Sequence, residues 1–286
     1  VPVVPQGGAM TTTTTRTAAG AVPSGHRWED AGSAWGHRAR DWACLFEHYA
    51  FEAVSAVLDR LAVAAGDRVL DVACGSGAVL RLMEAQGLRT AGIDAADPLV
   101  DIARLRAPAS DLRVGTMFDL PWSDGAFDAV TAVNGIWGGC DAAVAEAHRV
   151  LRPGGRIGVT YWGRAEPLDL RAAFKVFAAH SPDAHVEGMV RTNAISRDGV
   201  AEQMLTDAGF RLTDAGRCVS VLEWPDAETA WRAIASIGPA VPALAHVGAD
   251  VLRPLVLEAI EPCRDRLGIY RFRNDHRFLV AEKAGD

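Results

Sequence analysis

The stretch Arg68-Val-Leu-Asp-Val-Ala-Cys-Gly-Ser-Gly77 decides the fold. Its first six residues are almost continuously apolar, which is typical of a parallel strand that is covered on both faces. The two glycines end this strand and allow the next helix to begin close to it. The stretch therefore predicts a strand, a tight turn and a helix, the first unit of an open α/β sheet.

Strands and helices alternate along the chain from this point. Further strands are predicted at residues 90–94, 112–114, 127–133, 156–162, 217–222 and 270–281. Helical periodicity between the earlier strands indicates crossover connections, which are right-handed in parallel sheets. Upstream, apolar residues recur at three and four between Trp35 and Leu61, which predicts one long or two short amphipathic helices. The fold class is therefore α/β with a mostly parallel sheet.

Composition limits the partners of the protein. The 286-residue chain has a formal net charge of −7 and contains no basic run, which disfavours nucleic acid or an anionic membrane as a partner. It has no apolar stretch of transmembrane length, and its five scattered cysteines form no CxxC pair. We therefore expect a cytoplasmic protein, a monomer or homodimer, that binds a small molecule and no metal.

Residues beside the glycine turn indicate which ligand it holds. A dinucleotide template starting at Gly75 would need glycine or alanine where Leu80 stands. Asp71 would repel a pyrophosphate but attract a cation such as the ammonium and sulfonium groups of S-adenosylmethionine. Asp94 ends the second strand, where a carboxylate can accept hydrogen bonds from ribose hydroxyls.

Five segments resemble the class I S-adenosylmethionine-dependent methyltransferases in order and spacing. They are Val69–Gly77, Gly92–Asp94, Val114–Pro121, Asp124–Val130 and Val150–Gly155. The resemblance implies a Rossmann-like, mostly parallel seven-stranded sheet with helices on both faces, an N-terminal helical lid, and a helical cap inserted among the last strands. The flanking segments resemble the subgroup that methylates small metabolites.

This resemblance divides one structural domain into consecutive parts. They are a flexible tail at 1–25, in part a candidate expression remnant, a lid at 26–66, a cofactor-binding core at 67–163, a cap with a late strand at 164–268, and a final strand at 269–286.

The resemblance also implies cofactor contacts at the carboxyl ends of the strands. They come from Asp71, Ala73, Gly75 and Gly77 for the methionine part, Asp94 with the neighbouring Ala95 for the ribose, Met117 and Phe118 for the adenine, and Asn134 beside the methionine part and the substrate. Ala73 departs from the family pattern, because a glycine usually stands there. Thr116 also departs, since it replaces a common acidic adenine contact, for which Asp119 is a candidate substitute.

Aromatic residues outside the core are candidates for a substrate wall. They are Trp35, Trp42, Phe46, Trp137, Tyr161 and Tyr270, with His276 as a polar neighbour. Packing of the lid helix on the sheet explains the same aromatic pattern, so both interpretations stay open. Glu47 and His48 are candidates for a general base, which methyl transfer needs only for some acceptors.

We therefore expect methyl transfer from S-adenosylmethionine to a carbon, nitrogen or oxygen of a small, apolar or aromatic metabolite, in secondary metabolism. Two alternatives remain. One is an NAD(P)-dependent oxidoreductase on the same fold, and the other is a non-catalytic partner module that binds the cofactor.

Overall fold

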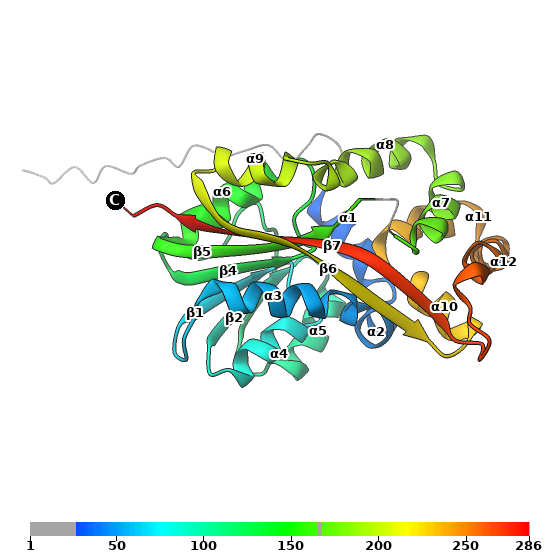
Figure 1. Cartoon of the computed structure of the whole chain (residues 1–286), viewed down its shortest axis with the longest axis horizontal. Helices are drawn as coiled ribbons and strands as arrows, with labels where there is room; N and C mark the ends of the chain where they lie inside the picture. The colour runs from blue at the N-terminus through cyan, green and yellow to red at the C-terminus, as the bar shows by residue number, and fades with distance from the viewer. Residues whose placement is uncertain (1–26, 165–167, 286) are drawn as a thin grey trace, which may run out of the picture.

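The computed structural model describes residues 27–164 and 168–285, so the predicted tail lies outside the described residues. Seven strands form one sheet in the order β3-β2-β1-β4-β5-β7-β6 (Figure 1). They are β1 (Arg68–Val72), β2 (Arg89–Asp94), β3 (Asp111–Val114), β4 (Phe127–Val133), β5 (Leu151–Trp162), β6 (Phe210–Trp224) and β7 (Tyr270–Lys283). The first five strands are parallel, and β7 is antiparallel to both of its neighbours. This arrangement confirms the Rossmann-like α/β prediction.

Helices cover both faces of the sheet (Figure 1). Apolar side chains of α3 (Phe51–Leu61), α4 (Ala78–Ala85) and α5 (Asp97–Arg106) share one buried cluster. Those of α6 (Asp141–Val150) and α9 (Val200–Asp207) belong to a second cluster, on the opposite face. The alternate residues of the central strands supply both clusters, as expected for strands buried on two sides.

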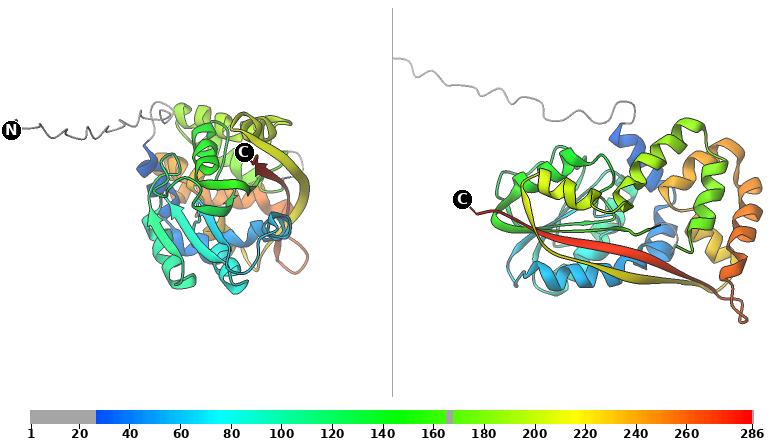
Figure 2. Two further views of the ribbon diagram at one scale, coloured as in Figure 1. Left: turned by 90° about the vertical axis from the view of Figure 1, so that its left-hand side faces the viewer. Right: turned by 45° about the horizontal axis from the view of Figure 1, so that its top comes forward.

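A helical cap lies beyond the carboxyl edge of the parallel strands. The long strands β6 and β7 run past this edge and reach the cap (Figure 2). The cap comprises α7 (Arg171–Ala179), α10 (Ala227–Ile234), α11 (Val241–Val247) and α12 (Ala249–Ile260), with the short 3₁₀ segments Gly238–Ala240 and Glu261–Cys263. Between the cap and α9, α8 (Asp183–Thr192) has no buried residue and is followed by a 3₁₀ turn at Asn193–Ser196.

The N-terminal lid is broken more often than its periodicity predicted. It consists of α1 (Trp28–Gly36), α2 (Ala39–Asp41), a π-helical turn η1 (Trp42–Phe46), a 3₁₀ turn η2 (Glu47–Ala50) and then α3. The apolar spacing of three and four does not distinguish an α-helix from these shorter turns. Such irregular turns often occur at functional sites, and here they carry Trp42, Glu47 and Tyr49.

The order of the strands marks a ligand site. From β1 the chain winds outward to β2 and β3, and later to β4 and β5 on the other side, so the winding reverses between β1 and β4. Ligands of open α/β sheets bind at the carboxyl ends of the strands beside such a reversal. Within 27–164 and 168–285, no helix is long and apolar enough to cross a membrane.

Candidate functional site

The glycine turn after β1 is the floor of the site. Ala73, Gly75 and Gly77 all have positive φ, at 58°, 54° and 78°. Gly77 precedes α4, and a Cβ there would lie 2.8 Å from the Cβ of Ala103 on α5. The glycine is therefore required both by the backbone conformation and by the close packing of α4 on α5.

Asp94 braces this turn from the end of β2. Its two carboxylate oxygens accept hydrogen bonds from the backbone N–H groups of Gly75 and Ala96, at 2.9 and 2.8 Å. Burial nevertheless raises the pKa of the carboxyl group, against the effect of these hydrogen bonds. Carboxylate oxygens can accept further hydrogen bonds, so Asp94 keeps capacity for ribose hydroxyls.

Asp71 is a buried carboxylate in β1, with only 1 % of its surface exposed. Its Oδ1 accepts a hydrogen bond of 2.7 Å from the Thr131 hydroxyl on β4. Burial raises the pKa of Asp71 to about 7, and the charges of Asp94 and Glu47 add to the effect. Near neutral pH this group is therefore costly to ionise unless a cation lies beside it.

Glu47 extends from the lid onto the glycine turn. Its Oε1 accepts a hydrogen bond from the backbone N–H of Ser76 at 3.1 Å, and its Oε2 binds the Ser76 hydroxyl. Arg106, at the end of α5, donates to Oε2 at 2.7 Å and to the Ala43 carbonyl at 2.9 Å. Burial raises the pKa of Glu47, although Ser76 and Arg106 oppose the shift.

These contacts hold the lid closed over the turn. The remaining cavity has a volume of about 50 Å³, and its walls include Trp42, Glu47, Tyr49, Asp71 and Gly75. Pockets that enclose ligands of drug size measure roughly 300–1,000 Å³. The space between the lid and the turn is therefore smaller than one that encloses a ligand as large as S-adenosylmethionine.

The loop after β3 carries the two residues that the resemblance implies for the adenine. Met117 is buried and Phe118 is half-buried, and both pack with the cluster on the α6 face. On the other side of β2, α1 presses against Ala95, because a Cβ on Gly32 would lie 2.1 Å from the Ala95 carbonyl oxygen. The lid therefore covers the ribose end as well as the methionine end of the expected cofactor site.

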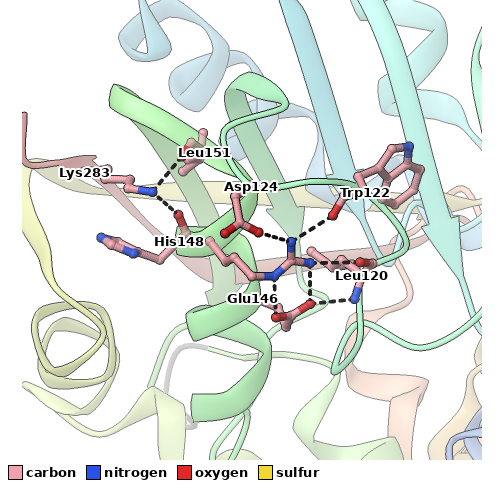
Figure 3. A network of polar contacts seen from close by, with 8 residues as sticks. Leu120, Trp122, Asp124, Glu146, His148, Leu151 and Lys283 are labelled. Carbon is pink, nitrogen blue, oxygen red and sulfur yellow. Dashed lines mark hydrogen bonds and ion pairs between the residues drawn. The ribbon is translucent and has the colours of Figure 1, made fainter. Parts of the chain in front are cut away.

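Arg149 of α6 fixes the same loop through its contacts with Leu120, Trp122, Asp124 and Glu146, which are labelled in Figure 3. Its guanidinium donates to the carbonyls of Leu120 and Trp122, at 2.9 and 2.8 Å. It also binds both carboxylate oxygens of Glu146, at 2.7 and 2.8 Å, and Asp124 at 2.8 Å. Glu146 in turn accepts from the backbone N–H of Leu120 at 2.7 Å. The network ties the chain just after Met117 and Phe118 to α6.

An aromatic cluster joins the lid to the sheet beyond the cofactor cleft. Trp42 stacks on Phe46, with ring centroids 5.2 Å apart. Tyr49 stacks on Trp162, the last residue of β5, at 4.8 Å and an interplanar angle of 4°. His276 of β7 lies 4.3 Å from the Trp162 ring. Trp42, Phe46 and His276 thus join one cluster, and the same packing also secures the lid to the sheet.

Other candidate residues lie elsewhere. His48 is exposed, so the structure gives no support to its role as a base. Tyr161 alternates with Trp162 along β5 and packs on the opposite face of the sheet, while Tyr270 hydrogen-bonds Glu261 at the cap end of β7. These two positions correct the substrate-wall prediction, because strand direction and face were not known from the sequence.

Two tryptophans predicted for the substrate wall lie in different parts of the structure. Trp35 packs edge-on against Trp42 at 4.9 Å and contacts the cap at Gly238, so it supports the lid from behind. Trp137 is half-buried against the cluster on the α6 face, not against the lid cluster.

The sequence alone did not single out several residues that the structure brings to the site: Ser76, Arg106, Thr131, Arg149, Trp162 and Ser220. The partner of Asp71 could have been found from strand pairing, because Thr131 lies directly opposite Asp71 in the register of β1 and β4. Arg106 follows no motif, since its role depends on how the lid folds back. Among the described residues, no group of three or more His, Cys, Asp or Glu side chains could hold a metal ion.

Comparisons with known proteins relate the segment that contains the glycine turn to methyltransferases. Residues 70–159 match the family model described as a methyltransferase domain. The demethylmenaquinone methyltransferase of Thermus thermophilus is 41 % identical over 98 residues, which cover 32 % of this chain and 44 % of that protein. The 27-O-demethylrifamycin SV methyltransferase of Amycolatopsis mediterranei is 35 % identical over 119 residues, which cover 37 % of this chain and 44 % of that protein.

The similarity is limited in extent. The chain spans about half the length of the curated relatives that it matches. Among solved structures, the [4+2]-cyclase SpnF has a TM-score of 0.55 at 20 % identity and covers 91 % of this chain and 94 % of its own. That likeness supports the fold alone, because a fold does not determine its chemistry. The matched segment, with the strand order and the glycine turn, shows that the chain carries a class I S-adenosylmethionine-dependent methyltransferase domain.

Proposed function

We propose that this chain binds S-adenosylmethionine at the glycine turn and transfers its methyl group to a small, apolar or aromatic metabolite. The observation that carries the proposal is the grouping of Asp71, Asp94 and Glu47 around the glycine turn, each with a pKa raised by burial. One buried and two half-buried carboxylates, whose one printed ion pair among the described residues joins Glu47 to Arg106, favour a cationic ligand. A pyrophosphate would meet repulsion at the same place.

The residues present fit this cofactor. Asp71 and the backbone of Ala73 and Gly75 would hold the methionine part, and Asp94 would bind the ribose. Met117 and Phe118 would border the adenine. When bound, S-adenosylmethionine supplies an electrophilic methyl group on its sulfonium. The residues of the chain have to bind it, orient it towards the acceptor and keep water out.

Orientation accounts for the catalysis better than a base does. Both carboxylate oxygens of Glu47 are already engaged by Ser76, and one also by Arg106. Holding donor and acceptor in line can lower a barrier by roughly 7–11 kcal/mol, and a lid closed over the bound cofactor would also keep water away from the methyl group. We therefore propose that Glu47 acts in lid closure and cofactor binding rather than as a proton acceptor.

The aromatic cluster supports an apolar or aromatic acceptor. Tyr49 lines the cofactor cleft and also stacks on Trp162, so the aromatic surface begins next to the methionine part of the site. The relative from Amycolatopsis mediterranei is named for a rifamycin substrate. We propose a role in secondary metabolism on these two grounds.

A thermal-shift titration tests the cofactor assignment. S-adenosylhomocysteine should raise the melting temperature, and NADH and NADPH should not. A shift with NADH or NADPH alone would instead support the oxidoreductase alternative. Radiolabelled methyl transfer to an extract of small aromatic metabolites then separates an enzyme from a non-catalytic partner module.

A further inference from the structure

Two buried polar side chains, each with one unpaired atom, lie side by side on the inner face of β7. His276 and Asn274 are both 0 % exposed and occupy alternate positions of the strand, so they share one face. The Nε2 of His276 and the Nδ2 of Asn274 have no hydrogen-bond partner in the structure. Buried polar atoms are nearly always paired, and leaving one unpaired costs free energy, so each such atom calls for an explanation.

His276 is held in one orientation from the side of β6. Its Nδ1 lies 3.1 Å from the hydroxyl of Ser220, which is itself 1 % exposed. Burial lowers the pKa of His276 to about 4, so the imidazole is neutral at physiological pH. A neutral imidazole has one donor and one acceptor nitrogen, and the Ser220 hydroxyl can satisfy either at Nδ1. Nε2 can therefore accept from a hydroxyl or donate to an oxygen.

A third polar group with unpaired atoms lies at the end of β4. Both side-chain atoms of Asn134 are buried and lack a partner of hydrogen-bond geometry. The residue has a φ of 51°, and its backbone N–H is fixed by the Thr160 carbonyl at 3.0 Å. A left-handed, non-glycine residue is sterically unfavourable, though asparagine tolerates it better than most. The backbone thus holds this amide at the substrate side of the strand ends.

The Tyr49 side chain shows what kind of ring fits between these groups. Its phenol lies flat on Trp162 at 4.8 Å, and its centroid is 5.2 Å from that of His276. Burial raises the pKa of the Tyr49 hydroxyl, and the neighbouring Asn134 side chain opposes this shift. Tyr49 belongs to the lid, so a lid movement that admits the cofactor would also take this phenol off Trp162.

Resting on the proposed function, we infer that His276, backed by Ser220, binds the hydroxyl group of an uncharged aromatic acceptor whose ring lies on Trp162. The charged group that shifts the pKa of His276 is Asp275, and this carboxylate already pairs with Arg217 at 2.8 Å. Asp275 lies on the opposite face of β7, where Arg277 is also within 4.0 Å of its carboxylate. The rings that lie against the imidazole, Tyr49 and Trp162, are uncharged, so burying an anionic acceptor among them would carry a desolvation cost. The site selects for a neutral ring that carries a hydroxyl.

Three matched probes test this inference. They are p-cresol, 4-methylbenzoate and toluene, measured by ligand-observed NMR titration at pH 7.5 with S-adenosylhomocysteine present. We expect p-cresol to bind about five- to tenfold more tightly than toluene, the size of effect expected of one hydrogen bond, and more tightly than 4-methylbenzoate. The ¹³Cε1 resonance of His276 should shift with p-cresol only.

Variants test whether His276 causes the preference for p-cresol over toluene. His276→Phe should abolish the preference for p-cresol over toluene, and Ser220→Ala should reduce it. Tyr270→Phe is the matched control, because this hydroxyl lies on the same face of β7 but bonds Glu261 at 3.0 Å in the cap. Equal binding of 4-methylbenzoate, an unchanged preference in His276→Phe, or no binding of p-cresol would each overturn the inference.

The outcome is separable from that of the proposed function. If S-adenosylhomocysteine does not bind the parent chain, the proposed function fails, while p-cresol titrated alone still decides the role of His276. If the cofactor product binds and p-cresol leaves the ¹³Cε1 resonance unmoved, only the inference fails. If His276→Phe does not fold, the ¹³Cε1 resonance of His276 in the parent chain still tests whether p-cresol contacts this residue.

Discussion

The Glu47 carboxylate of the lid accepts a hydrogen bond from the backbone N–H of Ser76, 3.1 Å away in the glycine turn. An N–H group at the start of a helix is a common anchor for anionic groups of ligands. Here the chain's own lid occupies it, with Arg106 completing the contact at 2.7 Å. Access to the site is thereby coupled to movement of the lid, and the following predictions depend on that geometry.

Replacing Asp71 with asparagine should stabilise the free protein and weaken cofactor binding. The pKa of Asp71 is raised from 3.8 to about 7, so the carboxyl favours the folded state when protonated. That stability is present below pH 4 and is lost as the pH rises through 7. At pH 8 the asparagine variant should gain up to roughly 4 kcal/mol in unfolding free energy. Denaturant unfolding at pH 5 and pH 8 measures it; a variant less stable at pH 8 would contradict the burial argument.

Replacing Ala73 with glycine should stabilise the chain without loss of cofactor binding. The φ of 58° at Ala73 is unfavourable for a residue with a Cβ. Glycine relieves this strain but also gives the unfolded chain more conformational entropy. The net gain in unfolding free energy should be roughly 0.5–1 kcal/mol. Chemical denaturation tests the gain and calorimetry with S-adenosylhomocysteine tests the affinity. Ala91→Gly, at a buried strand position without positive φ, is the control and should destabilise.

Replacing Arg106 with glutamine should loosen the lid. The substitution removes the contacts to Glu47 and to the Ala43 carbonyl, so residues 42–50 should exchange their backbone amides about tenfold faster. The association rate of S-adenosylhomocysteine should rise in stopped-flow measurements. Arg104→Gln is the matched control, because Arg104 pairs with Asp101 on the solvent side of α5. The same exchange rates in both variants would show that Arg106 does not hold the lid.

Replacing Arg149 with methionine should affect both stability and the adenine side of the site. It removes the bonds to Leu120 and Trp122 and leaves Glu146, only 9 % exposed, without its arginine. We expect a loss of roughly 1–3 kcal/mol and a weaker affinity for S-adenosylhomocysteine. Arg152→Met, which breaks the exposed pair with Asp128, should cost less. Equal losses in the two variants would rule out a specific role for the Arg149 network.

Local sequence was sufficient to predict the floor of the site. Asp71, Gly75 and Gly77 belong to one strand-turn-helix unit, and Asp94 ends the next strand, so their proximity follows from parallel pairing alone. The left-handed conformation at Gly75 and Gly77 agrees with the choice of glycine.

The lid over the glycine turn and the cluster around His276 could not be predicted from local sequence. The break of the lid into π and 3₁₀ turns, which places Glu47 over Ser76, depends on tertiary packing that a period of 3.6 does not encode. Trp162 and Ser220 meet His276 only because β7 inserts between β5 and β6. The prediction put Tyr161 in the substrate wall, but successive residues of a strand point to opposite faces of the sheet. Its neighbour Trp162 therefore lies on the face of the lid and Tyr161 does not.

The affinity for S-adenosylmethionine as a function of pH tests the central claim most directly. If a cationic cofactor binds beside Asp71, it binds the ionised carboxylate, whose pKa in the free chain is about 7. Calorimetry should then give a dissociation constant about tenfold lower at pH 8 than at pH 6. The Asp71→Asn variant, measured in parallel, corrects for titration of the ligand and should bind weakly without this dependence. A parent affinity that does not change with pH, falls as pH rises, or cannot be detected would contradict the account.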